Sequence, residues 1–441
     1  MSELYIIGAG LAGCEAAWQA AKRGVKVTLF EMKPYRYSPA HKSEGFAELV
    51  CSNSLRAMAV TNAVGLLKEE MRALGSLIIE AADATSVPAG AALAVDREKF
   101  SEYITDKISS EPNIKVIREE VKKIPDSPCI VASGPLTDGE LAEEITSLCG
   151  APLNFYDAVA PIVDASSIDY DKAFFASRWN KGDDGDYLNC PMEKDEYKAF
   201  YDALVSAETV PMDAADDGLK VFEGCMPVET MAKRGEDTIR FGPLKPVGIT
   251  NPKNDKRYYA IVQLRAENRA KTMYNLVGFQ TRLTWPEQRR VFRLIPGLEG
   301  AEFLRYGVMH RNSYIDSPRL LDSLYMLKSR PGLWFAGQLA GVEGYVESAS
   351  SGLVAGLAAA THIRGTEPPQ FPRYTATGAL SGYISDPFAA DFQPMNINFG
   401  IMEEPDTMSA LTGKQKHDKR ARAEKRAEAA LKYINELREL I

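Results

Sequence analysis

The segment from residue 4 to residue 31 constrains the fold of this chain more than any other. An apolar run, Leu4–Ile7, leads into a turn with three glycines, and an Ala-rich segment separates that turn from a second apolar run, Val25–Phe30, which ends at Glu31. A strand, a glycine turn, a helix and a second strand are the parts of a dinucleotide-binding unit. The segment therefore predicts a dinucleotide site at the start of the chain.

Each glycine of the turn has its own physical role in such a unit. Gly8 permits the tight turn, Gly10 lets the backbone approach a pyrophosphate, and Gly13 lets the helix pack closely against the strand. Glu31 is placed to accept a hydrogen bond from a ribose hydroxyl, while the helix N-terminus offers free N–H groups. The predicted contacts of the turn with the cofactor are Gly8, Ala9, Gly10, Leu11, Ala12 and Gly13. This segment alone does not decide between FAD and NAD.

Length and composition limit the class of protein. A chain of 441 residues with 45% hydrophobic residues can bury a sizeable core and is expected to form two domains. Neither a cationic leader with an apolar core nor a membrane-length apolar run is visible, so we expect a cytoplasmic protein with no membrane contact. The six cysteines include no C-x-x-C pair, which indicates free thiols rather than a disulfide scaffold or a metal site.

Charge is distributed unevenly along the chain. The net charge is −8, but residues 251–330 contain fifteen Lys and Arg against seven Asp and Glu. From residue 411 to the end the corresponding numbers are nine and five, and Ala427, Ile434 and Leu437 recur there at helical spacing, which predicts a basic C-terminal helix. The two basic regions are consistent with a face that meets a polyanion and equally with solvated surfaces.

The middle of the first half contains helices and a third strand. Apolar residues at helical spacing predict one amphipathic helix from Asn62 to about Ala81, and Asp96 is placed to cap the helix that follows. A strand edge is expected from Lys115 to Ile124. The run Cys129–Pro135 predicts a buried strand that ends in a tight turn at Gly134, a further cofactor contact.

The second half predicts an insertion and then a return to the nucleotide fold. From about residue 151 the sequence becomes aromatic and turn-rich. A strand ending at Gly337 and Gln338, then Gly344 and a helix, follow near residue 333, and we predict cofactor contacts at these three residues. The small residues of the helix are expected to let its backbone approach the sheet and its N-terminus approach a ligand. We predict an α/β fold: a Rossmann-like FAD-binding domain of the glutathione-reductase type (residues 1–150 and 326–441) interrupted by an inserted α+β domain (residues 151–325). Because no second G-x-G-x-x-G occurs, a nicotinamide cofactor has no fold of its own, which favours FAD.

Several longer motifs carry a resemblance that covers essentially the whole chain. The chain closely resembles the folate- and FAD-dependent tRNA uracil-5 methyltransferases (TrmFO), themselves similar to the GidA family of tRNA wobble-uridine modification flavoenzymes. The motifs are Leu49–Ser54, Asn62–Arg72, Asp186–Pro191, Phe222–Glu229, Gly278–Thr281, Tyr306–Asn312 and Phe392–Gly400. The cysteine-containing motifs around Cys51 and Cys225 distinguish the first family from the second.

The resemblance implies an activity and its cofactors. It implies transfer of a methylene from 5,10-methylenetetrahydrofolate to C5 of the T-loop uridine of tRNA, with reduction to a methyl by reduced FAD and with NADH or NADPH as reductant. No obligate protein partner is implied. Three alternatives remain open: the same chemistry on a ribosomal RNA uridine, wobble-uridine modification, and a flavin oxidoreductase or RNA-binding flavoprotein without methyl transfer.

The implied chemistry needs two basic groups of low pKa near one face of the uracil and the flavin, and two thiols can serve. C5 of uracil is a poor nucleophile until a thiolate adds to C6, and a base must later remove the C5 proton so that the thiolate can leave. We expect Cys225 to be the nucleophile and Cys51 to be the general base or protecting thiol, with exchange of the roles left open. Cys190 is a rival. The remaining cysteines are expected in the core: Cys14, Cys129 and Cys149.

Further residues are assigned to the folate and the RNA. The imidazole of His310 is expected either to stack on the pteridine or to be a hydrogen-bonded core group, and Arg311 and Asn312 are expected to bind the glutamate or the pterin edge of the folate. Gln280 and Arg282 beside Trp285 are weaker candidates, because Trp285 and Pro286 could be core. The expected phosphate contacts are the stretch Arg257–Arg293 together with Lys414, Lys416, Lys419 and Arg420, and the target base must be flipped out of its loop.

Overall fold

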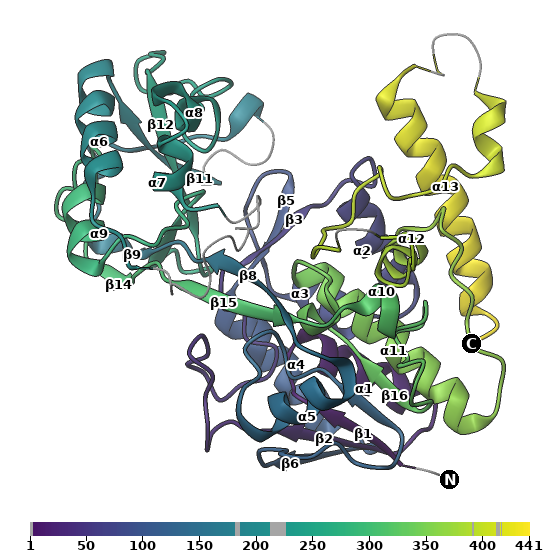
Figure 1. The fold of residues 1–441 in the computed structure, drawn as a ribbon. Helices are drawn as coiled ribbons and strands as arrows, with labels where there is room; N and C mark the ends of the chain where they lie inside the picture. The colour runs from purple at the N-terminus through teal and green to yellow at the C-terminus, as the bar shows by residue number, and fades with distance from the viewer. Residues whose placement is uncertain (1–2, 181–185, 212–225, 390–391, 412–414, 416) are drawn as a thin grey trace.

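The protein folds into two lobes joined by a two-stranded ladder (Figure 1). The computed structural model describes residues 3–180, 186–211, 226–389, 392–411, 415 and 417–441. The ladder pairs β8 (Leu153–Ala158) with β15 (Met309–Tyr314) in antiparallel register, with His310 opposite Asp157. β15 therefore runs out of one lobe and into the other.

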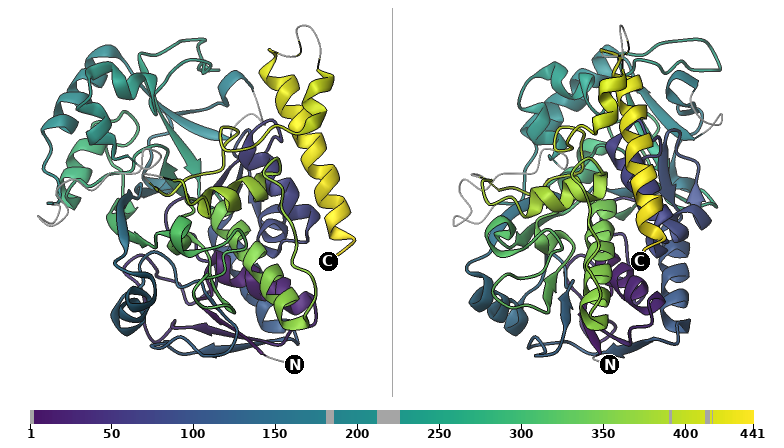
Figure 2. Two further views of the ribbon diagram at one scale, coloured as in Figure 1. Left: turned by 45° about the vertical axis from the view of Figure 1, so that its right-hand side comes forward. Right: turned by 90° about the vertical axis from the view of Figure 1, so that its right-hand side faces the viewer.

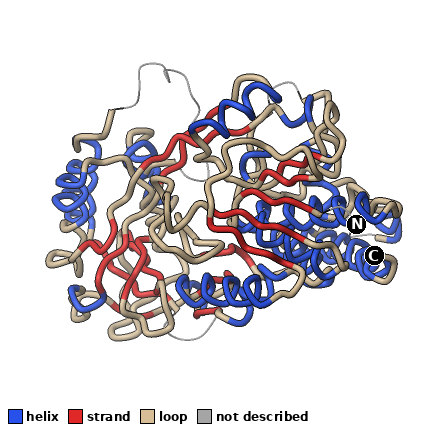
Figure 3. The backbone as a smooth tube through the Cα atoms, turned by 90° about the horizontal axis from the view of Figure 1, so that it is seen from below, coloured by secondary structure: helices blue, strands red, loops and turns tan. Residues whose placement is uncertain are grey.

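The first lobe is built on a five-stranded parallel sheet with the order β16-β7-β1-β2-β6. Its strands are β1 (Leu4–Ile7), β2 (Val27–Glu31), β6 (Ile114–Arg118), β7 (Cys129–Val131) and β16 (Leu333–Phe335). Figure 3 shows these strands side by side with helices gathered against them. β1 lies at the centre, so the glycine turn leaves the middle of the sheet. The predicted parallel α/β fold is confirmed.

Two helices of this lobe pack against each other at very short separation, because glycines of one helix face the backbone of the other. α1 (Leu11–Lys22) follows the glycine turn and packs against α11 (Tyr345–Arg364). A Cβ atom at Gly352 would lie 2.1 Å from the carbonyl oxygen of Ala12, and one at Gly356 would lie 2.6 Å from that of Ala16. The small residues of α11 are therefore required by packing against α1, whereas the sequence predicted a close approach to the sheet.

The predicted helix from residue 62 to residue 81 is interrupted, so that prediction is wrong in its middle. The structure has α2 (Ala63–Ala73) and α3 (Leu77–Ala84), separated by Gly75 with a φ of +74°. The Ser76 side chain caps α3 by accepting from the Ile79 N–H, and the buried Glu15 carboxylate accepts from the Ser76 hydroxyl at 2.7 Å. The break is thus stabilised from another element.

The remaining elements of the first lobe surround this framework. Asp96 caps α4 by accepting from the Lys99 N–H at 3.2 Å, as predicted. The other elements are β3 (Ser54–Ala57), β4 (Ser86–Val87), β5 (Ala92–Val95), α4 (Arg97–Ser110), α5 (Gly139–Cys149), α10 (Ser317–Leu320), α12 (Ala376–Ile384) and α13 (Lys419–Arg438). α13 packs on α2 and buries Ala427, Ile434 and Leu437, which confirms the predicted C-terminal helix (Figure 2).

The second lobe has its own core around a six-stranded sheet with the order β10-β11-β12-β13-β9-β14. Each strand pairs antiparallel with its neighbours in this order. Its elements are β9 (Ile162–Asp164), β10 (Phe174–Phe175), β11 (Tyr187–Met192), β12 (Ala260–Ala266), β13 (Met273–Leu276), β14 (Phe303–Arg305), α6 (Lys194–Ser206), α7 (Val228–Ala232), α8 (Glu236–Phe241) and α9 (Trp285–Phe292). The domain boundaries after residues 150 and 325 stay predictions. Among the helices of the described ranges, none is long and apolar enough to cross a bilayer.

Candidate functional site

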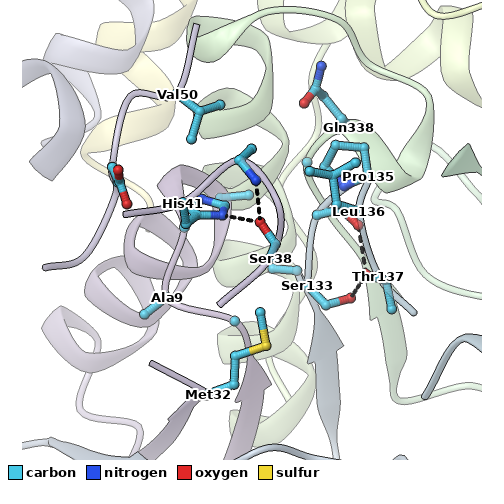
Figure 4. A pocket seen from close by; sticks show the side chains of 18 of the residues that line it. Ala9, Met32, Ser38, His41, Val50, Ser133, Pro135, Leu136, Thr137 and Gln338 are labelled. Carbon is cyan, nitrogen blue, oxygen red and sulfur yellow. Dashed lines mark hydrogen bonds between the residues drawn. The ribbon is translucent and has the colours of Figure 1, made fainter. Parts of the chain in front are cut away.

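A long cavity opens where the central strands of the parallel sheet end. It holds about 1450 Å³ free of protein atoms, counting the part open to solvent. Figure 4 shows Ser38, His41 and Val50 on one side of it, facing Pro135, Leu136 and Gln338 on the other, with Met32 near one end. Ligands of open α/β sheets bind at this edge, outside the carboxyl ends of the strands. The cavity is therefore the candidate site.

The glycine turn forms one wall of the cavity and has the predicted geometry. Gly8 has a φ of +98°, and a Cβ atom there would lie 2.6 Å from the carbonyl oxygen of Ala132. A Cβ atom at Gly13 would lie 1.8 Å from the carbonyl oxygen of Gly8, whereas one at Gly10 would meet no heavy atom within 4 Å. Gly8 and Gly13 are therefore required by the protein itself, and Gly10 leaves space that only a ligand would use.

The rest of the turn and Glu31 also face the cavity. Ala9, Leu11, Ala12 and Glu31 line it, and Gly13 does not, because it lies under Gly8. The Glu31 carboxylate accepts from the Ala9 N–H at 3.0 Å with one oxygen and from the Lys33 N–H at 3.0 Å with the other. A carboxylate has about four acceptor positions, so both oxygens keep capacity for ribose hydroxyls.

The turns that follow β7 and β16 close the opposite wall. Gly134, with a φ of +85°, and Gly337, with a φ of +77°, line the cavity together with Gln338. The Gly337 N–H donates to the Ser351 hydroxyl at 2.7 Å, so α11 fixes this turn. Gly344 lies outside the lining, and its φ of +106° serves the turn into α11 instead.

Cys51 lies in the cavity wall on a loop that we call the cysteine loop, Leu49–Ser54. Tyr345, the first residue of α11, accepts with its phenolic oxygen from the N–H groups of Cys51 (2.6 Å) and Ser52 (3.1 Å). Arg97 donates to the Leu49 carbonyl, and Arg305 donates to the Val50 carbonyl. Three side chains from distant parts of the chain therefore position the sulfur.

A further arginine ties the cysteine loop to the second lobe. Arg265, buried on β12, donates to the Ser52 hydroxyl at 2.7 Å and to the Asn53 side-chain oxygen at 2.8 Å. The Asn53 amide in turn donates to the carbonyls of Val95 and Ala266, each at 2.9 Å. Asn53 is fully buried, so the three bonds of its side chain form away from water.

The Cys51 thiol is held in its neutral form. Burial, with the Asp157 carboxylate adding to it, raises the pKa of Cys51 to about 12, although Arg97 and Arg305 act in the opposite direction. The Cys51 sulfur lies 4.0 Å from the Ala158 carbonyl oxygen. The sequence-based expectation of a low-pKa thiol is therefore wrong for the protein alone, because the desolvation of the sulfur outweighs the two guanidinium groups.

His310 and Asn312 reach the cavity from β15, and Arg311 does not. Successive residues of a strand point to opposite faces, so Arg311 leaves on the other side. His310 Nε2 is buried without a hydrogen-bond partner among the described residues, and burial together with Arg305 lowers the pKa of the imidazole. A neutral ring with an unsatisfied polar atom fits a ligand-binding group better than a hydrogen-bonded core histidine.

Among the described cysteines, Cys51 alone lines the cavity. Cys14, Cys129 and Cys190 are fully buried among apolar residues, and burial raises the pKa of each thiol. Cys190 belongs to the core of the second lobe, which removes it as a rival. Cys149 is half-buried. Cys225 lies outside the described residues.

Sequence reasoning missed several cavity residues. His41 lines the cavity and bonds to the Ser38 hydroxyl at 2.6 Å, and Asp157 and Tyr345 line it as well. Burial and then Lys33 lower the pKa of His41. His41 is one of only four histidines in the chain and lies in a polar loop, so the sequence did contain a signal for it. Nothing local in the sequence marks Asp157 or Tyr345.

The weaker candidates lie away from the cavity. Gln280 and Arg282 do not line it, and their backbones instead hold α7: Val228 N–H donates to the Gln280 carbonyl, and Arg282 N–H donates to the Glu229 carboxylate. Trp285 is 59% exposed, so the alternative that it belongs to the core is wrong.

Of the predicted phosphate contacts in the C-terminal region, Lys414 and Lys416 lie outside the described residues. Lys419 is exposed, and Arg420 pairs with Glu424 at 2.9 Å. No group of metal-binding side chains occurs among the residues that the structure describes.

Comparison with known proteins gives consistent matches. Residues 3–367 match the family described as glucose inhibited division protein A. A protein of Acetivibrio thermocellus named methylenetetrahydrofolate--tRNA-(uracil-5-)-methyltransferase TrmFO is 60% identical over 435 residues, 98% of each chain. One of the same name from Geobacter sulfurreducens is 58% identical over 97% of this chain and 98% of its own. In fold, the chain is similar to Aquifex aeolicus GidA, with a TM-score of 0.70, 17% identity and coverage of 99% of this chain and 74% of that one.

Proposed function

The chain belongs to the TrmFO family of methylenetetrahydrofolate--tRNA-(uracil-5-)-methyltransferases, and from that premise we propose that it forms 5-methyluridine at the T-loop uridine of tRNA, with FAD as cofactor. The observation that carries the proposal is the meeting of three parts in one cavity: the glycine turn, Cys51 and His310. A dinucleotide, a thiol and a flat neutral ring are the groups that this reaction needs together.

The cavity fits FAD on the evidence of its own residues. The open space beside Gly10 suits a pyrophosphate at the N-terminus of α1, and Glu31 suits the ribose hydroxyls. Gly134, Gly337 and Gln338 would line the remainder of the cofactor. When bound and reduced, FAD supplies the hydride that converts the transferred methylene to a methyl, with NADH or NADPH as the ultimate reductant.

The folate is expected at the end of the cavity lined by β15. The His310 ring would stack on the pteridine, because two flat rings of this kind make a favourable contact through their faces. His310 Nε2 and the Asn312 amide offer hydrogen bonds to the pterin edge, and both residues line the cavity. Arg311 points away from the lining, so we propose it for the glutamate tail, which must leave the cavity.

Two cysteines divide the covalent work at the uracil. We propose that Cys225 adds through its thiolate to C6, which makes C5 an enolate carbon that attacks the methylene of the folate, with breakage of one folate C–N bond. Removal of the C5 proton then expels tetrahydrofolate through breakage of the second C–N bond and leaves an exocyclic methylene on C5. Hydride adds to this methylene, and breakage of the C–S bond restores the C5=C6 double bond and releases Cys225. Cys51, held neutral until the substrates fill the cavity, is the proposed proton acceptor after its own ionisation.

The product of one reaction tests this proposal. Purified protein is incubated with an unmodified tRNA transcript, methylenetetrahydrofolate labelled in its methylene and NADH or NADPH, and the nucleosides are then analysed. The proposal predicts labelled 5-methyluridine at the T-loop and none without folate. A parallel incubation with ribosomal RNA tests the other RNA class, and label found there alone contradicts the tRNA assignment.

The cysteine roles have a separate test. Wild-type protein should form a covalent adduct with tRNA that carries 5-fluorouridine, because fluorine at C5 prevents release of the thiolate. Cys225→Ala should form none, and Cys51→Ala should still form one. An adduct with Cys225→Ala contradicts the assignment of the nucleophile.

A further inference from the structure

Three aromatic rings form a ladder on the second lobe, beside the edge where α9 and β14 lie (Figure 1). The ring centroids of Trp285 and Tyr306 lie 5.3 Å apart, and those of Tyr306 and Phe303 lie 5.4 Å apart, with an interplanar angle of 15° in each pair. Phe303 in turn contacts Phe292, which is fully buried. The ladder is thus anchored in the core at one end and ends at Trp285.

The outermost ring is exposed although it is fixed. Trp285 is 59% exposed, whereas Trp18 and Trp334 are buried at 8% and 1%. Trp285 begins α9 and is followed by Pro286, which starts the helix with a fixed φ. The indole of Trp285 is therefore exposed to solvent in a fixed orientation. Another flat ring can stack on it and extend the ladder.

A basic side chain holds the middle ring and adds charge. Arg289 donates to the phenolic oxygen of Tyr306 at 2.6 Å from Nη2 and at 3.2 Å from Nε. Arg289 and Arg290 are both exposed on α9, and Glu287 pairs with Arg290. Arg289 therefore places a positive charge beside the ladder, in the region where basic residues outnumber acidic ones.

The ladder lies a few residues before the part of β15 that lines the cavity. Gly307 is bonded to Gln288 of α9 in both directions, at 2.7 Å from its N–H and at 2.9 Å to its carbonyl oxygen. Tyr306 lies four residues before His310, and a fully extended chain spans at most about 3.6 Å per residue. The Cα atoms of Tyr306 and His310 are therefore at most about 14 Å apart, which is close enough for a nucleotide beside one in the cavity.

We propose that the ladder of Phe303, Tyr306 and Trp285 is a stacking platform for an unpaired nucleotide of the RNA substrate, a neighbour of the uridine that enters the cavity. The proposal rests on the proposed function for the identity of the substrate. Every base has a flat apolar face that can stack on the indole of Trp285, and the Arg289 guanidinium can pair with a phosphate of the same RNA.

The test measures RNA binding without folate or reductant. Fluorescence anisotropy with an unmodified tRNA transcript and with its isolated T-arm hairpin is used to compare wild-type protein with Trp285→Leu and Trp285→Phe. Loss of stacking should weaken binding of both RNAs about tenfold in the leucine variant. The phenylalanine variant should stay within about threefold of wild type because it keeps a ring. Trp179→Leu, at a residue that is 63% exposed, is the matched control and should bind like wild type.

Salt dependence separates stacking from charge. Trp285→Leu should leave the slope of log Kd against log salt unchanged, and Arg289→Gln should reduce it by about one. FAD content and Tm check the fold of each variant, and Trp285→Tyr with Trp285→Gln repeats the comparison if the leucine variant does not fold. Equal binding by Trp285→Leu and wild type, or equal losses in the leucine and phenylalanine variants, overturns the platform.

The outcomes for the platform and for the proposed function are distinguishable. Wild-type protein that binds RNA through Trp285 but forms no 5-methyluridine contradicts the methyltransferase alone. If the wild-type protein forms 5-methyluridine and the Trp285→Leu variant binds RNA as tightly as wild type, the platform alone is contradicted. A change in self-association of Trp285→Leu, with RNA binding unchanged, assigns the surface to a second copy and also overturns the platform.

Discussion

The two ends of the cavity are built in different ways. The glycine turn is formed by the backbone of one short segment, and its shape follows from positions where a Cβ atom does not fit. The cysteine loop is formed by a segment without regular structure, and Arg97, Arg305 and Tyr345 reach it from far along the chain. The dinucleotide end is therefore encoded locally, whereas the reacting end depends on the completed tertiary structure.

The largest expected effect separates two glycines of the same turn. Gly13→Ala places a Cβ atom 1.8 Å from the Gly8 carbonyl oxygen, so we expect loss of FAD and destabilisation by more than about 3 kcal/mol. Gly10→Ala meets no protein atom within 4 Å, so its Tm should be retained while FAD affinity falls. Thermal melting and FAD content measure both. Equal losses of Tm in the two variants would contradict a turn whose glycines have separate roles.

The next effect concerns the thiol in the cysteine loop. With a pKa near 12, Cys51 should react with iodoacetamide at pH 8 at least about a hundredfold more slowly than an ordinary thiol. The rate should rise about tenfold per pH unit up to pH 10, because only the thiolate reacts. Peptide mass spectrometry measures the modification, with a short cysteine peptide as control. Rapid modification of Cys51 at pH 7 would show that the guanidinium groups outweigh burial.

The same shift has a consequence for stability. The folded-state pKa of Cys51 lies above the ordinary thiol value, so the folded protein holds this proton more tightly than the unfolded chain. The corresponding stability is complete below about pH 8.5 and is lost as pH rises towards 12. Cys51→Ala should therefore melt with a weaker dependence on pH in that range, and an unchanged dependence would assign the loss to other groups.

The smallest effect comes from one anchor of the cysteine loop. Tyr345→Phe removes the acceptor for the N–H groups of Cys51 and Ser52, which should cost about 1–3 kcal/mol of stability. Misplacement of the sulfur should lower kcat about tenfold while FAD content stays unchanged. Tyr103→Phe, on the outer surface of α4, is the control. A Tyr345→Phe enzyme with wild-type kcat would mean that the remaining contacts are sufficient to position Cys51.

The sequence predicted the locally encoded parts of the molecule best. The glycine turn, the strands of the parallel sheet and the cap at Asp96 are all as expected, because each follows from residues a few positions apart. The break at Gly75 was missed because the apolar period continues through it, although the glycine itself was a signal. Local patterns are thus reliable until a glycine interrupts them.

The contacts of the reacting end could not be predicted from the sequence. Tyr345 and Cys51 are separated by 294 residues, and no spacing rule relates them. The pKa of Cys51 was expected to be low from its chemical role, but its value depends on how the folded chain removes water from the sulfur. Trp285 was left between two interpretations because an aromatic residue at a helix start is equally compatible with core and surface.

A crystal structure of the FAD-loaded protein with bound methylenetetrahydrofolate tests the central claim most directly. The account predicts the pyrophosphate at Gly10, the flavin ring at the end of the cavity near Cys51, and the pteridine stacked on His310 with its edge bonded to Asn312. A flavin ring at the opposite end of the cavity, or a folate bound away from His310, would contradict the account.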